Sequence, residues 1–346
     1  MLRYLTAGES HGLGLVAILE GMPAGIKIEL EDINKELKRR QQGFGRGKRM
    51  QIEKDTARII SGLKGGFTLG SPIALLIQNK DASIEKLHKV VCPRPGHADL
   101  AGLLKYGFSD LRSVLERASA RSTAAQVGLG ALCKILLGEF GIKVTSRVLS
   151  IGGKSRDEEM KEKILEAIKR KDTLGGIFEI TVKKAPVGLG SYVHPDKRLD
   201  GRIAQSVMAI PGVKSVEIGL GSGYAGKFGS ESHDAIYYSG KQGFFRKQNN
   251  AGGIEGGISN GEDIVVRACM RPICTLLEPL ESVNILTKNI SRAAVERSDI
   301  CVVEAAGVIA ESVVAFVLAD CLLEKFGSDN ISDIKKAFRD YLKRIN

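Results

Sequence analysis

The sequence predicts an α/β fold that is built as one unit. Short apolar strands alternate along the chain with segments whose apolar residues recur every three or four positions, and no low-complexity linker divides the 346 residues. Hydrophobic residues make up 43% and charged residues 26%, a composition typical of an ordered globular chain. We therefore expect residues 1–346 to form a single domain, in which residues 151–175 are polar enough to form an insertion or a flap.

Strands and one short helix are predicted in the first third of the chain. "LRYLTAG" (2–8) and "GLVAILEG" (14–21) have the pattern of strands, as do residues 57–62 and 71–79. "LEDINKELKRRQ" (30–41) is predicted to be a helix because acidic residues precede apolar residues at helical spacing. A long helix is expected from Asp110 to about Phe140, which would place Arg117 and Arg121 on one face.

The second half repeats this mixture of elements. Strands are predicted at 147–153 and 175–186 on either side of a charged helix at 156–172. A glycine-rich tract at 249–261 leads into another strand, and two helices follow Ala305. The most apolar stretch (305–327) carries Glu311 and Asp320 inside it, which favours a buried helix over a membrane span. The N-terminus lacks the pattern of an export signal, so we expect a cytoplasmic protein.

Charge and cysteine usage narrow the classes of ligand. The net charge of +11 favours an anionic partner, and residues 35–54 carry eight basic side chains against two acidic ones. Arginines set among glycines in this segment favour anion binding, because the backbone can approach a ligand closely there. The six cysteines form no C-x-x-C pair, so we expect reduced thiols and no metal site.

Residues 7–18, "AGESHGLGLVAI", support two interpretations. Residues 12–17 fit the G-x-G-x-x-A pattern of a dinucleotide-binding turn, but that turn must open a helix, and the run that follows Gly14 has the pattern of a strand. The other interpretation centres on His11. A second histidine, His97, lies between Arg94 and Asp99 in a turn-rich segment. Two loop histidines among many arginines predict acid–base groups around an anion.

Two rival functions follow from the same segments. The glycine pattern alone would indicate a flavin- or nicotinamide-dependent oxidoreductase that transfers a net hydride. "GFGRGKR", with Phe44 as a stacking platform, would indicate an RNA-binding module. The absence of Trp and an aromatic content of 5% count against the second rival.

Six motifs in order give the chain a specific resemblance. They are "AGESHG", "RRQQGFGRGKRM", "RPGHAD", "ERASAR", "NNAGGIEGGISNG" and "RSDICVVEAAGVIAESVVAFVLADCLLEKFG". Together they resemble the chorismate synthase family over nearly the whole chain. The sequence departs from that family's common residues at four positions, which are Ser122, Gln126, Arg271 and Glu304.

The resemblance implies a fold, a reaction and partners. The fold would be an α/β sandwich of antiparallel β-sheets packed between α-helices, assembled as a homotetramer. The reaction would convert 5-enolpyruvylshikimate 3-phosphate into chorismate and phosphate in the shikimate pathway, by a 1,4-anti elimination without net redox change. The family is a lyase family that needs reduced FMN, and NADPH would be used only if the protein reduces its own flavin. No nucleic acid, membrane or metal is implied as a partner.

The resemblance also implies the site residues, by their positions in the motifs. The catalytic set would be His11, His97 and Asp299, with one histidine near the flavin, the other near the departing phosphate, and the assignment between them open. The substrate-binding set would be Arg40, Arg46, Arg49, Arg94 and Arg121. The cofactor-binding set would be Arg117, Ala118, Ser119, Gln248, Asn249, Gly256, Arg271, Pro272, Ile273, Cys274, Thr275 and Arg297.

Overall fold

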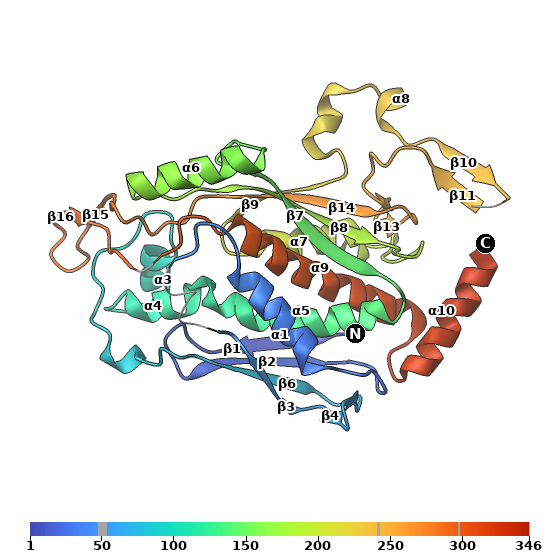
Figure 1. Ribbon diagram of the computed structural model, residues 1–346, viewed down its shortest axis with the longest axis horizontal. Helices are drawn as coiled ribbons and strands as arrows, with labels where there is room; N and C mark the ends of the chain where they lie inside the picture. The colour runs from blue at the N-terminus through green and yellow to red at the C-terminus, as the bar shows by residue number, and fades with distance from the viewer. Residues whose placement is uncertain (48–53, 241–242, 297, 346) are drawn as a thin grey trace.

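Two four-stranded antiparallel sheets enclose a layer of helices (Figure 1). This computed structural model describes residues 1–47, 54–240, 243–296 and 298–345. The first sheet has the strand order β1-β2-β6-β3 and the second has the order β7-β8-β14-β9. Their strands are β1 (Arg3–Ala7), β2 (Gly14–Glu20), β3 (Ala57–Ser61), β6 (Ile73–Gln78), β7 (Lys143–Ile151), β8 (Gly176–Lys183), β9 (Val213–Ile218) and β14 (Ile264–Met270).

The first sheet buries one face and exposes the other, as its alternating sequence requires. Leu15, Ala17 and Leu19 of β2 are each at most 1% exposed and face the helices, whereas Val16 and Ile18 are 38% and 39% exposed. Residues paired across strands lie on the same face, so Leu5 of β1 joins Ile18 on the outer face. This outer face is apolar yet uncovered by any described part of the chain.

Four helices form the layer between the sheets. They are α1 (Leu30–Gln41), α5 (Thr123–Gly138), α7 (Leu199–Met208) and α9 (Val303–Phe326). Helix α9 is apolar on all sides, and its most apolar 18-residue window is 94% buried inside the protein. It packs against α5 and α7 within the layer and against β7 and β8 above it. The expected α/β class with antiparallel sheets is confirmed, and the helices lie between the sheets rather than outside them.

A buried ionic cluster ties the helix layer together at Glu311 of α9. Arg39 at the end of α1 donates two hydrogen bonds of 2.8 Å to its carboxylate, while Lys134 of α5 and Ser146 of β7 also contact it. Burial alone would raise the pKa of Glu311, but these partners outweigh that effect and lower the pKa. The end of α1 is thereby tied to α9 through Arg39.

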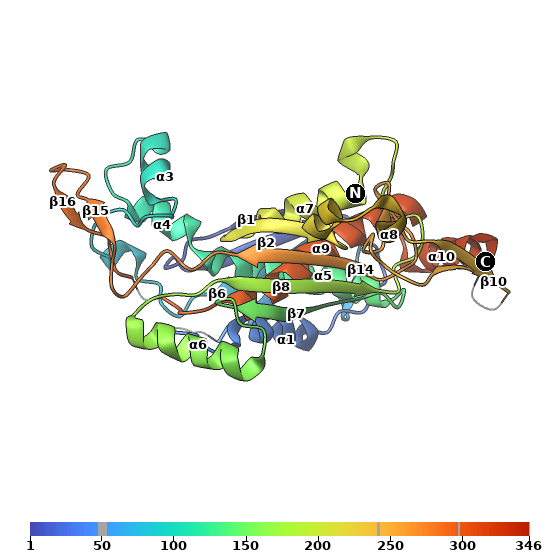
Figure 2. The ribbon, with the colours of Figure 1, turned by 90° about the horizontal axis from the view of Figure 1, so that it is seen from above.

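The remaining elements lie around the sandwich (Figure 2). Figures 1 and 2 both place α3 and the β15–β16 hairpin at one end of the molecule, and the β10–β11 hairpin with the C-terminal helix at the other. These outer elements are α3 (Asp99–Tyr106), α4 (Arg112–Ala118), α6 (Asp157–Arg170), α8 (Gly229–Ser232), α10 (Ile331–Ile345), β4 (Leu63–Lys64), β5 (Phe67–Thr68), β10 (Ile236–Ser239), β11 (Gly243–Arg246), β12 (Ile254–Glu255), β13 (Ile258–Ser259), β15 (Glu281–Val283) and β16 (Ile290–Arg292), with four 3-10 turns η1 (Ile84–Lys86), η2 (Ala120–Ser122), η3 (Pro195–Lys197) and η4 (Gly221–Gly226).

Most predicted elements are found at the expected positions, and one prediction is wrong. The helix predicted at 30–41 is α1, and that at 156–172 is α6, whose Met160 and Ile164 join the main core. The long helix from Asp110 to Phe140 is instead interrupted at Ser119, whose backbone is extended (φ −62°, ψ 141°). The break separates α4 from α5, so Arg117 and Arg121 do not share a helix face.

Candidate active site

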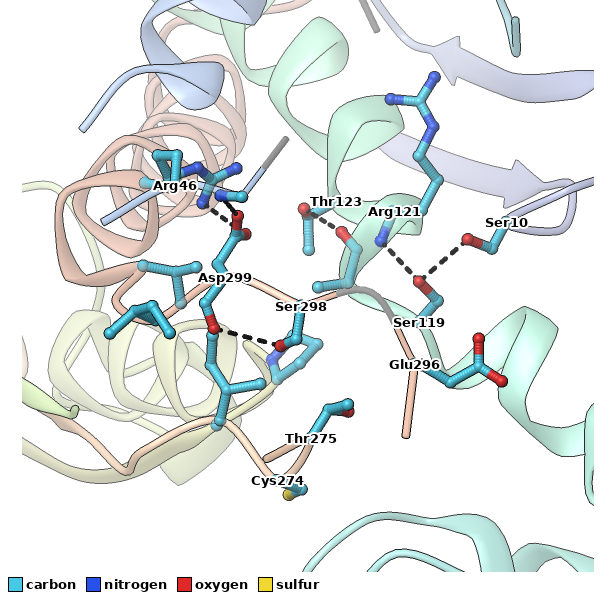
Figure 3. A pocket seen from close by; sticks show the side chains of 18 of the residues that line it. Ser10, Arg46, Ser119, Arg121, Thr123, Cys274, Thr275, Glu296, Ser298 and Asp299 are labelled. Carbon is cyan, nitrogen blue, oxygen red and sulfur yellow. Dashed lines mark hydrogen bonds and ion pairs between the residues drawn. The ribbon is translucent and has the colours of Figure 1, made fainter. Parts of the chain in front are cut away.

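A cavity of about 1530 Å³ brings together segments that are far apart in the sequence (Figure 3). Its wall includes the loop after β1, the end of α1, the turn before α3, the break between α4 and α5, and the start of α9. Among the described residues, five arginines line it, against three carboxylates. The arginines are Arg40, Arg46, Arg94, Arg121 and Arg271, and the acidic residues are Asp81, Glu296 and Asp299.

His11 is held by a carboxylate on α4. Its Nδ1 lies 3.0 Å from Glu116 Oε1, and its backbone N–H donates to Glu116 Oε2 at 2.8 Å. Burial alone would raise the pKa of Glu116, but the hydrogen bonds from His11 and the charge of Arg112 outweigh it, so the pKa is lowered. The ionised carboxylate therefore orients the ring and directs Nε2 away from Glu116.

His97 has a partner of the same kind. Its Nδ1 lies 2.5 Å from Asp99 Oδ1, and Asp99 is fully buried at the start of α3. Arg94 donates to both oxygens of that carboxylate, from Nε at 2.8 Å and from Nη2 at 3.0 Å. Burial alone would raise the pKa of Asp99, but His97 and Arg94 hold it well below the usual range. Each histidine of the pocket thus has an ionised carboxylate behind it.

Arg40 and Arg121 are fixed by one buried aspartate. Asp55 accepts from Arg121 Nη1 at 2.5 Å and from Arg40 Nη1 at 3.3 Å. Burial lowers the pKa of Arg40 to about 10 although Asp55 opposes this effect, and the group stays charged at neutral pH. The Nη2 atom of Arg121 is buried and has no hydrogen-bond partner among the described residues. It is therefore a donor that an anion could satisfy.

Asp299 lies on the pocket wall and holds the glycine loop that follows α1. Its carboxylate accepts from the Gly47 backbone N–H at 2.5 Å and lies 3.3 Å from Arg46 Nη1 (Figure 3). The Nε atom of Arg46 is buried without a partner in the described part of the chain. Asp299 and Arg46 therefore lie side by side on the cavity wall.

The segment 271–275 forms a further part of the wall. Thr275 accepts a hydrogen bond of 2.8 Å from Arg94, and Arg271 donates to the Gly96 carbonyl at 2.8 Å and contacts the Cys274 sulfur. This segment is therefore tied to the turn that carries His97. Ala118 and Ser119 also line the cavity, and Ser119 Oγ lies 3.2 Å from Ser10 Oγ.

Four predicted cofactor residues are not among those that line the cavity. Arg117 is exposed and donates to the carbonyls of Thr6 and Gly8. Asn249 donates a hydrogen bond to the Asp263 carbonyl and accepts one from the Gly253 backbone N–H, so it stabilises its own loop. Gln248 accepts a hydrogen bond from Asn250. Gly256 occupies the turn between β12 and β13 at φ +58°. Arg49 and Arg297 lie outside the described residues.

Several residues that hold the site together were not predicted from the sequence. Glu116 stands in the "ERASAR" motif next to Arg117, and its presence there as the only acidic residue of the motif could have marked it as a partner for a histidine. Asp55 and Asn79 follow no motif, and no pattern in the sequence marks them. Both are at most 9% exposed and contact arginines of the pocket, which is visible only in the fold.

The glycines beside His11 serve backbone packing. A Cβ on Gly8, at φ +109°, would lie 2.2 Å from the Gly14 carbonyl oxygen, and one on Gly14 would lie 2.8 Å from that of Ile77. Gly14 begins strand β2 directly, so the helix that a dinucleotide turn requires is absent from this described segment. The interpretation of the run after Gly14 as a strand is confirmed, and His11 rather than the glycine pattern lies on the cavity wall.

The fold and the pocket define a class of protein: an α/β-sandwich enzyme with a cationic cavity and two carboxylate-held histidines.

Comparisons with known proteins agree with this class. The family model for chorismate synthase matches residues 2–323. Chorismate synthases of Caldanaerobacter subterraneus and Thermoanaerobacter pseudethanolicus are each 54% identical to the chain, covering 99% of it and 99% and 98% of their own lengths. A crystal structure of chorismate synthase matches at a TM-score of 0.83 and 44% identity, over 99% of this chain and 98% of that one. The chain belongs to the chorismate synthase family.

Three of the four departures from the family's common residues have a structural account. Arg271 donates to the Gly96 carbonyl at 2.8 Å and so ties its segment to the turn that carries His97. Glu304, at the start of α9, accepts a hydrogen bond of 3.2 Å from the Phe44 backbone N–H and so holds the glycine loop. Ser122 donates to the Ser119 carbonyl at 3.1 Å and supports the break between α4 and α5. Nothing in the structure explains Gln126, whose buried Oε1 lacks a hydrogen-bond partner among the described residues.

Proposed function

We propose that this protein converts 5-enolpyruvylshikimate 3-phosphate into chorismate and phosphate by a 1,4-anti elimination, with reduced FMN as cofactor. The single observation that carries the proposal is the five-arginine cavity with its two carboxylate-held histidines. In the elimination a C–H bond and the C–O bond to phosphate break, a second ring double bond forms, and no electrons are gained or lost overall. The enzyme is accordingly a lyase.

The charge of the substrate matches the charge of the cavity. Two carboxylates and a phosphate with a charge of about −1.5 to −2 bring nearly four negative charges into one site. Arginine is suited to them because it remains charged and can donate two parallel hydrogen bonds. Arg121 Nη2 and Arg46 Nε are buried donors that lack partners in the described chain, so a bound anion would satisfy them. Arg94, held by Asp99, would contribute a third cation.

The histidines would supply the proton that the departing phosphate needs. Both present Nδ1 to an ionised carboxylate, which leaves Nε2 for the ligand. Which of the two serves the phosphate stays open. Asp299, beside Arg46, is proposed to accept or return a proton at the flavin side of the cavity.

Reduced FMN fits the residues present. The cavity exceeds the roughly 300–1,000 Å³ typical of a single small-molecule site, so it has room for a cofactor beside the substrate. Ala118, Ser119 and the segment 271–275 would hold the cofactor, together with Arg40 and Arg46. When bound, it would supply transient electron density to the substrate. NADPH is proposed as a reductant only if the protein reduces its own flavin.

We further infer that the chain forms a homotetramer and works in the cytoplasm. The outer face of the β1-β2-β6-β3 sheet supports self-association. Leu5 of β1 is 75% exposed beside Ile18 of β2, and Ile60 of β3, at the other edge of the sheet, is 56% exposed. An uncovered apolar sheet face of this kind is typical of an interface. No nucleic acid or membrane is proposed as a partner.

The test is turnover under anaerobic conditions. Purified protein is given 5-enolpyruvylshikimate 3-phosphate with FMN kept reduced by dithionite, and phosphate and chorismate are measured; oxidised FMN is the control. Turnover with reduced flavin, without its stoichiometric consumption, is expected. A folded, flavin-binding sample that releases no phosphate would overturn the proposal.

A further inference from the structure

We propose that Asn79 is a positioning residue that couples the substrate arginine Arg121 to the loop that carries His11. Its kinetic consequences rest on the proposed function, whereas its geometric consequences do not. Asn79 follows β6 directly and is 9% exposed. It belongs to none of the motifs and is not among the residues that line the cavity.

Asn79 uses the two ends of its amide for two different parts of the site. Its Oδ1 accepts from Arg121 Nε at 2.9 Å. Its Nδ2 donates to the carbonyl of Glu9 at 3.1 Å and to that of Gly12 at 2.8 Å. A guanidinium can only donate and a carbonyl can only accept, so one orientation of the amide satisfies all three partners.

The histidine loop is thereby held from two sides. On the side of β6, Asn79 holds the carbonyls that flank Ser10 and His11, and its backbone N–H donates to Leu13 at 3.2 Å. On the side of α4, the Glu116 carbonyl accepts from the Ser10 backbone N–H at 3.0 Å. The Glu116 carboxylate holds His11 itself. Asn79 also accepts a hydrogen bond from the side chain of Arg121, a proposed substrate-binding residue.

This arrangement makes the position of His11 depend on the position of Arg121. Arg121 is bound at Nε by Asn79 and at Nη1 by Asp55, which leaves Nη2 for the anion. The anion held by Arg121 and the ring of His11 are then placed relative to one another through a buried amide. The Ser119 hydroxyl adds a second link, because it accepts from the Arg121 backbone N–H at 3.3 Å and lies 3.2 Å from Ser10 Oγ. Preorganisation of this kind matters because a displacement of about 1 Å can reduce turnover by about a hundredfold.

The decisive variant is Asn79→Asp. The introduced carboxylate still accepts from Arg121, but it has no N–H for the two carbonyls and faces them with a negative oxygen. We expect kcat to fall by about 10–100-fold, while the calorimetric Kd for 5-enolpyruvylshikimate 3-phosphate stays within about threefold of the wild-type value. The ratio of variant to wild-type kcat should rise as the pH is lowered, because a protonated carboxyl group can donate to one carbonyl again.

Two further variants complete the design. Asn79→Ala removes both links, so Kd should rise by about tenfold in addition to the fall in kcat. Thr68→Val is the matched control: Thr68 is 3% exposed, lies outside the cavity and pins another loop through Pro23 and Ile26. Thr68→Val should lose about as much thermal stability as Asn79→Ala, yet keep the wild-type kcat and pH profile.

The outcomes separate the inference from the proposed function. Wild-type kcat in Asn79→Asp, or an equal loss in Thr68→Val, would overturn the inference. If wild-type protein shows no turnover, the proposed function fails, and the ring resonances of His11 in ¹⁵N NMR decide the inference instead. They should move in Asn79→Asp and stay in place in Thr68→Val; resonances unchanged in Asn79→Asp would overturn the coupling.

Discussion

At the scale of single residues, the site depends on the buried carboxylates that contact its two histidines. His11 and His97 come from different loops, yet each presents Nδ1 to a buried carboxylate, Glu116 and Asp99 respectively. The two acids differ in their support. Asp99 is also held by hydrogen bonds from Arg94, whereas Glu116 is hydrogen-bonded by the backbone and ring of His11 and has Arg112 Nη1 at 3.8 Å. Among the residues of the cavity wall, Glu116 is therefore expected to act on turnover through His11.

Glu116→Gln tests this role. The amide keeps the shape of the side chain but removes the negative charge that orients the ring, so kcat should fall by about 10–100-fold with little change in the KM for substrate. Steady-state kinetics under anaerobic conditions measure both constants. Glu139→Gln, at a surface pair with Lys335, is the control and should leave kcat unchanged.

The same variant has a pH signature in stability. Because the pKa of Glu116 is lowered by folding, its ionised form stabilises the native state above the unfolded value near 4.5, and this contribution is lost as the pH falls through the folded pKa. Urea unfolding should therefore show a stability gap between wild type and Glu116→Gln at pH 7 that narrows below about pH 4.5. A gap that widens on acidification would contradict the lowered pKa.

At the scale of elements, the interrupted helix and the close packing of α5 on α9 place the site. The extended backbone at Ser119 turns the chain between α4 and α5, so that Glu116 faces His11 while Arg121 faces Asp55. Helix α5 then runs against α9 so closely that a Cβ on Gly130 would lie 2.2 Å from the Cβ of Ser312. The start of α9 supplies part of the cavity wall.

Gly130→Ala should separate these helices. The added methyl group meets backbone and Cβ atoms that cannot rotate away, so we expect a loss of about 1–3 kcal/mol in the free energy of unfolding. Gly138→Ala is the matched control on the same helix, because no atom lies within 4 Å of its Cβ position. It should be neutral or stabilising by up to about 1 kcal/mol. Equal effects of the two variants in urea unfolding would show that the contact with Ser312 does not limit stability.

At the scale of the whole molecule, one apolar surface has no counterpart within the described chain. The inner faces of the two sheets are covered by α1, α5, α7 and α9, but the outer face of β1-β2-β6-β3 displays Leu5, Val16, Ile18 and Ile60. Burial of such a face against another copy would stabilise the assembly by about 25 cal/mol for each Å² of apolar surface.

The double variant Leu5→Lys/Ile60→Lys should therefore weaken self-association. Opposed lysines on this face would have to lose their hydration or repel one another, so light scattering after size exclusion should give a smaller mass than that of the wild-type protein. Leu165→Lys, an exposed residue of α6, is the control and should keep the wild-type mass. A double variant with unchanged mass would place the interface on another face.

The sequence by itself determined the local elements, the chemical class of the site residues and the family. Period-2 strands such as β2 and the 3.6-residue pattern of α1 depend on neighbouring residues, and therefore could be predicted from the chain alone. His11, His97 and all five of the described cavity arginines were predicted from their motifs, and the structure places all seven on the wall of one cavity. The tertiary structure decided what depends on long-range contacts: the break at Ser119, the layer order, and the roles of Asp55, Asn79 and Glu116. Asp55 lies 66 residues from Arg121, and Glu116 lies 105 residues from His11. Such partners leave no local pattern, because a buried carboxylate or amide acquires its role only when the fold brings a distant donor to it.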